Sequence, residues 1–400
     1  MSPQDARLFH RYKHHVARSL SVPINDKDDL RNHVATLSYP TPFFFTSREL
    51  LKRNYEIFTE LFDNAEVYYA LKANSDPKIL TYLNELGCGF EAASAFEIDQ
   101  LLKLGVNPDK IIYGTAIKPS EHIRLSFDAG VKRFAADSRE ELQKIAQHAP
   151  GAKIFVRAIV DDAGSVFTMS ERFGTPLNTV QGLLLEARDL GLKLYGISFY
   201  VGSQAIDAQK WANGILSVRP IIEELYKDGI QLEILNIGGG FPVPYQNHQQ
   251  AAELPEIVAN IHNALHQLPY IPKLLMEPGR GIVATSTVLV SEIIARNDRA
   301  GVPWLCTDAG IYNALYEAMI HQGNTVYPVR PLVDPVEPAP SAMFTIAGPT
   351  GDSLDIVARD VILPDYLGLG DRLLFENAGA YTICLASAFN GFPTPELYIG

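Results

Sequence analysis

The sequence has few of the features that mark secreted, metal-binding or membrane proteins. Its three cysteines, Cys88, Cys306 and Cys384, are scattered without the spacing of a disulfide framework or a metal site. No apolar run approaches the ~18 residues that span a bilayer. The residues before Phe9 lack the apolar core of a signal peptide. We therefore expect a cytoplasmic protein with no bound metal and no membrane partner.

Basic residues are also in deficit. The chain has 34 Lys and Arg against 46 Asp and Glu, a formal net charge of -12, which argues against a nucleic-acid partner. Low-complexity segments and short repeats are lacking as well. With 47% apolar and 20% charged residues the chain is globular, and 400 residues suggest two domains.

What the sequence does contain is a regular alternation that begins near residue 66. Short apolar runs rich in strand formers alternate with amphipathic helical stretches. Eight such runs end near Lys72, Glu91, Gly114, Ala136, Arg157, Tyr200, Gly238 and Glu277. This alternation predicts an α/β fold, a (β/α)8 barrel of the TIM type.

The composition changes after residue 282. Strand candidates without long intervening helices cover 285–294, 304–307, 341–347, 356–358, 372–375 and 397–399, and 331–340 is a proline-rich loop. We predict a barrel over residues 43–282 and a second, mainly β domain formed by 1–42 and 283–400. Residues 1–40 are expected to form a lead-in helix and loops. A strand at Thr41–Phe45 precedes a helix at 48–62 that Ser47 can cap.

Lys72 ends the first apolar run of the barrel. Lysine is rarely buried, so its place after a buried strand allows two interpretations. The side chain either reaches solvent from the strand end, or presents an amine for a Schiff base at the mouth of the barrel. The polar residues at the other strand ends favour the second interpretation, because barrel active sites lie at the carboxyl ends of the strands.

Two further motifs follow the last two strands. Gly238–Gly240 lets backbone N–H groups approach a phosphate, although three glycines can also simply form a tight turn. Glu277 and Arg280 suit a ligand with a cationic ring nitrogen and a phosphate, although they can also pair with each other. With Lys72, these groups indicate pyridoxal 5′-phosphate, whose protonated ring accepts electrons from a Cα carbanion.

From about residue 40 onward the chain resembles a known family. This family is the barrel-fold pyridoxal-phosphate decarboxylases of ornithine, lysine, arginine and diaminopimelate, which are related to alanine racemase. The resemblance rests on Tyr69–Asn74, Phe90–Ser94, Val201–Gln204, Gly238–Pro242, Glu277–Arg280, Gly348–Thr350 with Asp352, Glu376–Thr382 and Phe389–Phe392. The last motif is most similar to the ornithine decarboxylase branch.

The resemblance implies roles for particular residues and a head-to-tail homodimer with shared active sites. Lys72 holds the cofactor as a Schiff base. The phosphate is bound by Ser203, Gly238, Gly239, Gly240, Arg280 and Tyr381, and the ring is contacted by Glu91, Arg157, Tyr200 and Glu277. Asp352 reaches across the dimer to the distal end of the substrate. Phe389 and Tyr312 line the same site.

Three positions depart from the family pattern. Gly351 stands where the family has a cysteine that directs protonation at Cα. Tyr200 replaces a histidine that stacks on the ring; tyrosine still stacks but does not titrate near neutrality. In the stretch 310–321, Ile320 and His321 stand where enzymes for diamino acids carry an acidic residue that faces the terminal ammonium, although Glu317 is close in sequence.

We therefore expect an amino-acid decarboxylase that forms an amine and CO2 from an ornithine- or lysine-like amino acid or a modified one, in polyamine or specialised amine biosynthesis. Because glycine cannot donate a proton, one alternative is a decarboxylation-dependent transaminase or oxidase. Another alternative is a catalytically silent regulatory homologue, although Lys72, Glu277 and Arg280 are retained.

Overall fold

The computed structural model describes residues 24–62, 65–246, 251–320, 326–335 and 339–400. The chain divides into two compact units. One unit is formed by the described residues within Tyr55–Pro242 and Gln250–Gly281, and the other by the described residues within Met1–Asn54, Val243–Gln249 and Ile282–Gly400. Among the described residues, no helix has both the length and the hydropathy of a membrane span.

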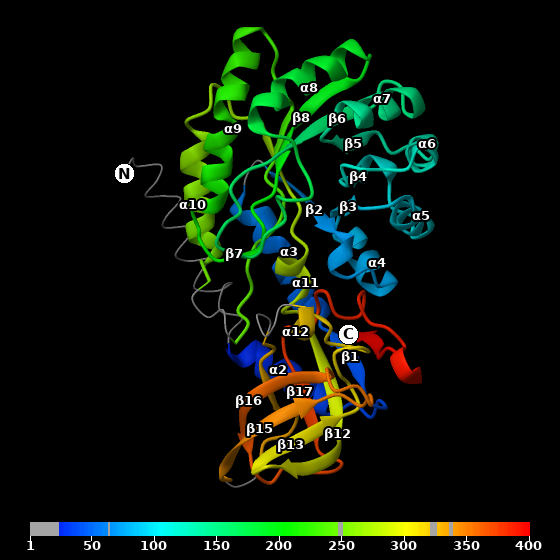
Figure 1. The fold of residues 1–400 in the computed structure, drawn as a ribbon, viewed down its shortest axis with the longest axis vertical. Coiled ribbons are helices and arrows are strands. Elements are labelled where there is room, and N and C mark those ends of the chain that lie inside the picture. The colour runs from blue at the N-terminus through cyan, green and yellow to red at the C-terminus, as the bar shows by residue number, and fades with distance from the viewer. Residues whose placement is uncertain (1–23, 63–64, 247–250, 321–325, 336–338) are drawn as a thin grey trace. The chain divides into compact units, whose positions relative to one another are not determined.

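The first unit contains a closed barrel of eight parallel strands, which confirms the predicted fold class (Figure 1). The strands are β2 (Ala65–Ala70), β3 (Gly89–Ala92), β4 (Ile111–Tyr113), β5 (Arg133–Ala136), β6 (Lys153–Ala158), β8 (Lys193–Phe199), β10 (Ile234–Asn236) and β11 (Lys273–Met276). They correspond one to one to the eight predicted runs. The barrel closes where β10 pairs with both β8 and β11.

Apolar side chains from seven strands fill the barrel. The buried cluster comprises Tyr68, Ile112, Ala135, Phe155, Tyr195, Ile234 and Leu275. Strands that are buried on both faces have continuous apolar runs, which explains why the sequence showed runs here and not a clean alternation.

Helices surround the strands of this unit (Figure 1). They are α4 (Pro77–Glu85), α5 (Ala95–Lys103), α6 (Ser120–Asp128), α7 (Arg139–His148), α8 (Leu177–Asp189), α9 (Lys210–Lys227) and α10 (Leu254–Leu265), with 3-10 turns η1 (Leu71–Ala73) and η2 (Pro108–Lys110). Asp76, Ser94 and Ser138 accept hydrogen bonds from N–H groups in the first turns of α4, α5 and α7. These caps fix where each helix begins after its strand.

A small antiparallel pair, β7 (Ser165–Phe167) and β9 (Ser203–Ala205), lies outside the closed barrel. The sequence did not predict it. The hydroxyl of Ser165 donates to the carbonyl of Val201 at 2.6 Å, and Ala205 N–H donates to the carbonyl of Gly240 at 3.0 Å. The pair therefore joins the loops that follow β6, β8 and β10.

The second unit is mainly β, as predicted. Its strands are β1 (Phe43–Thr46), β12 (Thr287–Arg299), β13 (Val302–Thr307), β14 (Val329–Pro331), β15 (Ser341–Ala347), β16 (Ile356–Pro364), β17 (Arg372–Phe375) and β18 (Glu396–Ile399). Six of them follow the order β14-β17-β12-β13-β15-β16, and β1 pairs with β12 and β18. The unit also contains α2 (Ile24–Ala35), α12 (Glu317–Ile320) and η3 (Phe389–Gly391). α3 (Arg48–Leu61) and α11 (Arg280–Val283) each cross the division between the units.

Strand β1 was predicted to open the barrel domain at residue 43, but it belongs to the β unit. It pairs with β12 and β18 in the β unit and not with a barrel strand. Phe43 and Phe45 pack there with Leu30, Val34 and Leu374 in a buried cluster. Partners more than 200 residues away in sequence thus decide the place of this aromatic strand. Ser47 follows it and accepts a hydrogen bond from Leu50 N–H at 3.3 Å, as a cap for α3.

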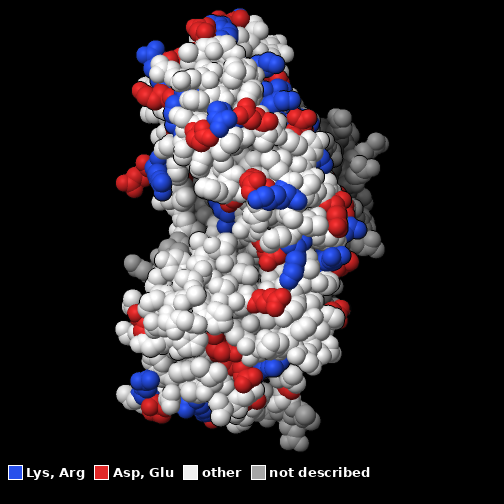
Figure 2. Space-filling model, turned by 90° about the vertical axis from the view of Figure 1, so that its right-hand side faces the viewer, with Lys and Arg blue, Asp and Glu red and all other residues white. Residues whose placement is uncertain are grey.

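Charged side chains of both signs lie on the face shown in Figure 2. On the face shown in Figure 2, the described acidic and basic side chains are interspersed without a continuous basic patch.

Candidate active site

Lys72 lies in η1, directly after β2, at the carboxyl end of the barrel strands. Its Nζ is 3.2 Å from Oε2 of Glu91, a residue of β3 whose neighbour across the sheet is Ala70. The Lys72 side chain is 48% exposed, whereas the Glu91 side chain is 4% exposed. The structure therefore brings together two of the predicted site residues, with an accessible amine beside a buried carboxylate.

Glu97 also lies in this region, although it was not predicted from the sequence. Its Oε2 accepts a hydrogen bond from Ala93 N–H at 2.6 Å, while Glu97 N–H donates to Oγ of Ser94 at 3.2 Å. Burial raises the pKa of Glu97, and the charge of Glu91 adds to this. The Ser-x-x-Glu spacing of a helix cap was the sequence signal that could have identified it.

Glu277 follows β11 and is partly buried. Its Oε1 accepts a hydrogen bond from Nδ2 of Asn236 at 2.6 Å. Burial, together with the charge of Glu91, raises the pKa of Glu277 to about 7, although Lys72, Asn236 and Arg157 oppose this increase. A nearby cation would stabilise the charged form of this carboxyl group and so lower its pKa.

The glycine loop Gly238–Gly240 approaches other backbone segments closely. A Cβ on Gly239 would lie 2.4 Å from the carbonyl oxygen of Glu277, and one on Gly240 would lie 2.2 Å from that of Gly202. The indole N–H of Trp211 donates to the carbonyl of Gly239 at 3.1 Å. Only glycine fits at these two positions, because a side chain there would clash with the neighbouring backbone.

Arg157 and Tyr200 lie at the ends of neighbouring strands β6 and β8. The Arg157 guanidinium is 5.7 Å from the centre of the Tyr200 ring and 5.4 Å from that of Phe173. Arg280 begins α11, is buried, and has its guanidinium 5.8 Å from the centre of the Phe167 ring. Ser203 is paired with Phe167 between β9 and β7.

The remaining predicted site residues belong to the β unit. Tyr312 and Phe389 have ring centres 4.4 Å apart. Partial desolvation and the charge of the neighbouring Asp352 carboxylate raise the pKa of Tyr312. Tyr381 has a left-handed backbone with φ of 54°. His321 lies outside the described residues.

Asp355 organises the Asp352 loop and was not predicted. Its carboxylate accepts hydrogen bonds from Ile311 N–H at 2.9 Å, from Thr350 N–H at 3.0 Å and from the Thr350 hydroxyl at 2.6 Å. It thus joins the loop after β15 to the segment that carries Tyr312. Gly351 is exposed in this loop, and a Cβ there would meet no atom within 4 Å.

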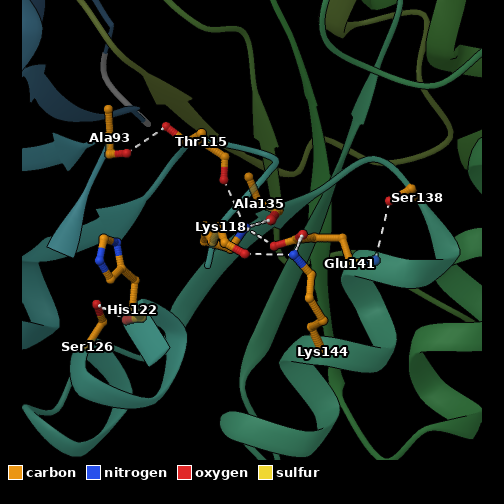
Figure 3. Close-up of polar contacts among 9 residues, drawn as sticks. All are labelled: Ala93, Thr115, Lys118, His122, Ser126, Ala135, Ser138, Glu141 and Lys144. Carbon is orange, nitrogen blue, oxygen red and sulfur yellow. Dashed lines mark hydrogen bonds and ion pairs between the residues drawn. The ribbon is translucent and has the colours of Figure 1, made fainter. Parts of the chain in front are cut away.

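A second lysine lies near the same end of the barrel (Figure 3). Lys118, in the loop after β4, donates to the carbonyls of Thr115 at 2.8 Å and Ala135 at 2.6 Å. Its Nζ is 2.9 Å from Oε1 of Glu141, which also pairs with Lys144 at 2.6 Å. The Lys118 side chain has no exposed surface, so this cluster joins the loop to β5 and α7 without offering a free amine.

Comparison with known proteins assigns the chain to a family. The pyridoxal binding domain of the pyridoxal-dependent decarboxylases matches residues 48–284. The lysine/ornithine decarboxylase of Selenomonas ruminantium is 34% identical over 353 residues, which are 88% of this chain and 88% of that protein. Antizyme inhibitor 2 of Xenopus laevis is 31% identical over 384 residues, 91% of this chain and 82% of that protein.

Solved structures agree with this assignment. SrLDC, as a mutant in complex with PLP, has a TM-score of 0.86 at 32% identity and covers 93% of this chain and 94% of its own. The lysine/ornithine decarboxylase of Vibrio vulnificus complexed with putrescine has a TM-score of 0.83 at 26% identity, covering 94% and 98%. The parallel barrel with a mainly β domain is thus alanine racemase-like. The chain belongs to the pyridoxal-dependent decarboxylases of the ornithine, lysine and arginine decarboxylase family.

Proposed function

We propose that the protein is a pyridoxal-phosphate-dependent decarboxylase that converts an ornithine- or lysine-like amino acid, or a modified one, to its amine and CO2. The observation that carries the proposal is the convergence of Lys72, Glu91, Glu277 and the glycine loop at the carboxyl end of one barrel. Barrel enzymes have their active sites at this end.

The residues present fit pyridoxal 5′-phosphate. Glu277 has a raised pKa in a partly buried place, so a protonated ring nitrogen is the partner that its carboxylate needs. Gly239 and Gly240 have no side chains, and their N–H groups are proposed to bind the phosphate with the help of Arg280 and Ser203. Lys72 supplies the accessible amine.

The bound cofactor would supply an electron-poor ring that accepts the electron pair left when the α-carboxylate departs as CO2. In this proposal Glu277 holds the proton at the ring nitrogen. Glu91 keeps the Lys72 amine at the mouth of the barrel, where Lys72 can take up and return a proton. Tyr200, whose ring centre lies 5.7 Å from the Arg157 guanidinium, is proposed to provide an aromatic face for a flat ligand.

Tyr312, Phe389 and Asp352 are proposed to bind the distal end of the substrate. A carboxylate beside two aromatic rings attracts an ammonium group by charge and by cation–π contact. The proposal includes the head-to-tail homodimer, in which these residues of one subunit complete the site of the other. Mixing Lys72→Ala and Asp352→Ala subunits would then restore about a quarter of the wild-type activity, since half of the dimers contain one intact site.

Product analysis tests the activity. The holoprotein is incubated with ornithine, lysine, arginine and diaminopimelate, with and without oxygen, and the CO2, amines, aldehydes and cofactor are quantified by mass spectrometry. The proposal expects CO2 and amine in equal amounts with unchanged cofactor. Lack of CO2 from these substrates and from a wider panel of modified amino acids would contradict it.

Gly351 supports a second candidate, a decarboxylation-dependent transaminase or oxidase. The Asp352 loop has no side chain at this position, and its backbone leaves space for one. Gly351→Cys therefore adds a thiol without a steric clash. If the wild type releases aldehyde or consumes oxygen, this variant should shift the products toward amine. A wild type that forms amine alone excludes this candidate.

A silent regulatory protein is a third candidate, because antizyme inhibitor 2 of Xenopus laevis is among the relatives. Borohydride reduction distinguishes it. A catalytic protein should retain pyridoxal phosphate on the Lys72 peptide after reduction, and Lys72→Ala should abolish this label. A wild type that binds no cofactor would favour the regulatory candidate.

A further inference from the structure

Asn236 connects two parts of the proposed cofactor site. It is the last residue of β10 and is buried. Its Nδ2 donates to Oε1 of Glu277 at 2.6 Å, and its Oδ1 accepts a hydrogen bond from Gly238 N–H at 2.9 Å. The two ends of one amide thus contact the carboxylate and the glycine loop.

The backbone closes this connection into a ring. Glu277 N–H donates to the carbonyl of Gly238 at 2.8 Å. Asn236, Gly238 and Glu277 are therefore joined pairwise by three hydrogen bonds. Two of these bonds link the end of β10 to Glu277, which follows the neighbouring strand β11. A shift of the Glu277 carboxylate would break a bond to Asn236 and would disturb the loop as well.

We propose that Asn236 is a positioning residue that fixes the Glu277 carboxylate and ties it to the glycine loop, so that one hydrogen-bonded unit holds both the ring nitrogen and the phosphate of the cofactor. This inference rests on the proposed function for its ligand. An amide suits the role because it is a donor and an acceptor at once and does not titrate.

The hydrogen bond from Asn236 Nδ2 affects the protonation of Glu277. Glu91 is close enough for its charge to raise the pKa of Glu277, and the Asn236 hydrogen bond acts in the opposite direction. Without the Nδ2 donor, Glu277 holds a proton more readily and its free oxygen is less strictly oriented. A cationic ring nitrogen then finds a weaker partner.

Two variants distinguish the Nδ2 donor of Asn236 from its Oδ1 acceptor. Asn236→Leu has a similar side-chain volume but removes both the donor and the acceptor. Asn236→Asp retains the acceptor for Gly238 N–H and donates to Glu277 only while its carboxyl group is protonated. Asn107→Asp is the matched control, because Asn107 is exposed, accepts from Asp109 N–H at 2.9 Å through Oδ1, and receives the same change of charge.

Binding is measured by spectrophotometric titration of the full-length apoprotein with pyridoxal phosphate and with an analogue that has carbon in place of the ring nitrogen. A hydrogen bond to a charged group is worth about 10- to 100-fold in affinity. We expect Asn236→Leu to reduce the preference for pyridoxal phosphate over the analogue by about this factor. The ratio cancels any general weakening of the loop, which lowers both affinities equally.

The pH profile gives an independent readout. Asn236→Asp should bind pyridoxal phosphate nearly as well as the wild type at low pH and lose affinity as the pH rises, whereas the wild type and Asn107→Asp should not show this extra loss. An unchanged preference in Asn236→Leu, or an Asn236→Asp profile parallel to that of the wild type, would overturn the proposal.

The apoprotein separates failure of this inference from failure of the proposed function. NMR titration of a 13C-labelled Glu277 carboxyl group needs no cofactor. Asn236→Leu should move its titration midpoint upward if the amide orients and stabilises the carboxylate. If the wild type binds no pyridoxal phosphate but this midpoint moves, the proposed function fails and the positioning role stands; an unmoved midpoint contradicts the role itself.

Discussion

Lys72 and Lys118 each lie beyond a barrel strand, and each pairs with a buried glutamate, yet their surroundings are opposite. The Lys72 side chain is 48% exposed and its Nζ lies 3.2 Å from Glu91. The Lys118 side chain is fully buried, with Glu141 at 2.9 Å and two backbone carbonyls as further acceptors (Figure 3). An ion pair with a buried carboxylate therefore does not by itself identify the reactive lysine.

The difference lies in the access that each side chain offers to a ligand. Two backbone carbonyls accept hydrogen bonds from the Lys118 ammonium, and the Glu141 carboxylate forms an ion pair with it. Burial lowers the pKa of Lys118 to about 8. A nucleophilic lysine must be accessible to its ligand. The Lys72 side chain is accessible, whereas the Lys118 side chain is fully buried. The two regions thus represent a structural use and a proposed catalytic use of the same residue type.

The largest expected effect comes from removing Lys72. Lys72→Ala should lower CO2 release by about 10²- to 10⁴-fold, because it removes the amine that is proposed to attach the cofactor and to move protons. Lys103→Ala, which changes a 74% exposed lysine, serves as the control. Borohydride labelling sharpens the comparison further, since the label should appear on the Lys72 peptide and not on the Lys118 peptide. A labelled Lys118 would break the distinction.

Removing Lys118 should affect stability more than chemistry. Lys118→Met leaves Glu141 buried with Lys144 as its remaining cationic partner, and we expect a loss of about 3 kcal/mol in the free energy of unfolding. Lys118→Met combined with Glu141→Leu should recover most of this loss, because no buried charge remains there. Urea denaturation of the three proteins measures both effects. A double variant no more stable than the single one would refute this explanation.

Titration of Lys118 gives a smaller effect. Its pKa is lowered from 10.5 to about 8, so between these pH values the native state binds fewer protons than the unfolded state. The free energy of unfolding should therefore rise with pH in this window, by on the order of 1–3 kcal/mol. The double variant lacks the titrating group and should not show the rise. Parallel pH curves for the two apoproteins would contradict the assignment.

The smallest effect concerns the helix caps beside the two lysines. Ser94 caps α5 through Glu97 N–H at 3.2 Å, and Ser138 caps α7 through Glu141 N–H at 3.3 Å. Ser94→Ala and Ser138→Ala should each cost about 1 kcal/mol of stability. Ser138→Ala removes a hydrogen bond from Glu141, the residue that pairs with Lys118, whereas Ser94→Ala does not. The stability effects of Ser138→Ala and Lys118→Met should therefore be non-additive, and those of Ser94→Ala and Lys118→Met should be additive. A double-mutant cycle by thermal denaturation tests this contrast.

Much of the barrel was predictable because its strands have continuous apolar runs with polar residues at their ends. The same pattern singled out Lys72, Glu91 and Glu277 as candidate site residues. They lie at or just after the ends of β2, β3 and β11, so locating the strands in the sequence is enough to find them. Asn236 and Lys118 were missed because their partners, Glu277 and Glu141, are distant in sequence and their own types occur commonly in loops. Glu97 was the exception, since its cap spacing was readable.

The sequence by itself determined the eight apolar runs, the strand ends and the glycine loop, since these follow from local periodicity and from backbone freedom. Only the tertiary structure decided that β1 joins the β unit, that Asn236 holds Glu277, and that Lys118 is enclosed while Lys72 is exposed. The reason is physical: exposure, desolvation and hydrogen-bond partners are properties of a packed neighbourhood, which segments far apart in the chain build together.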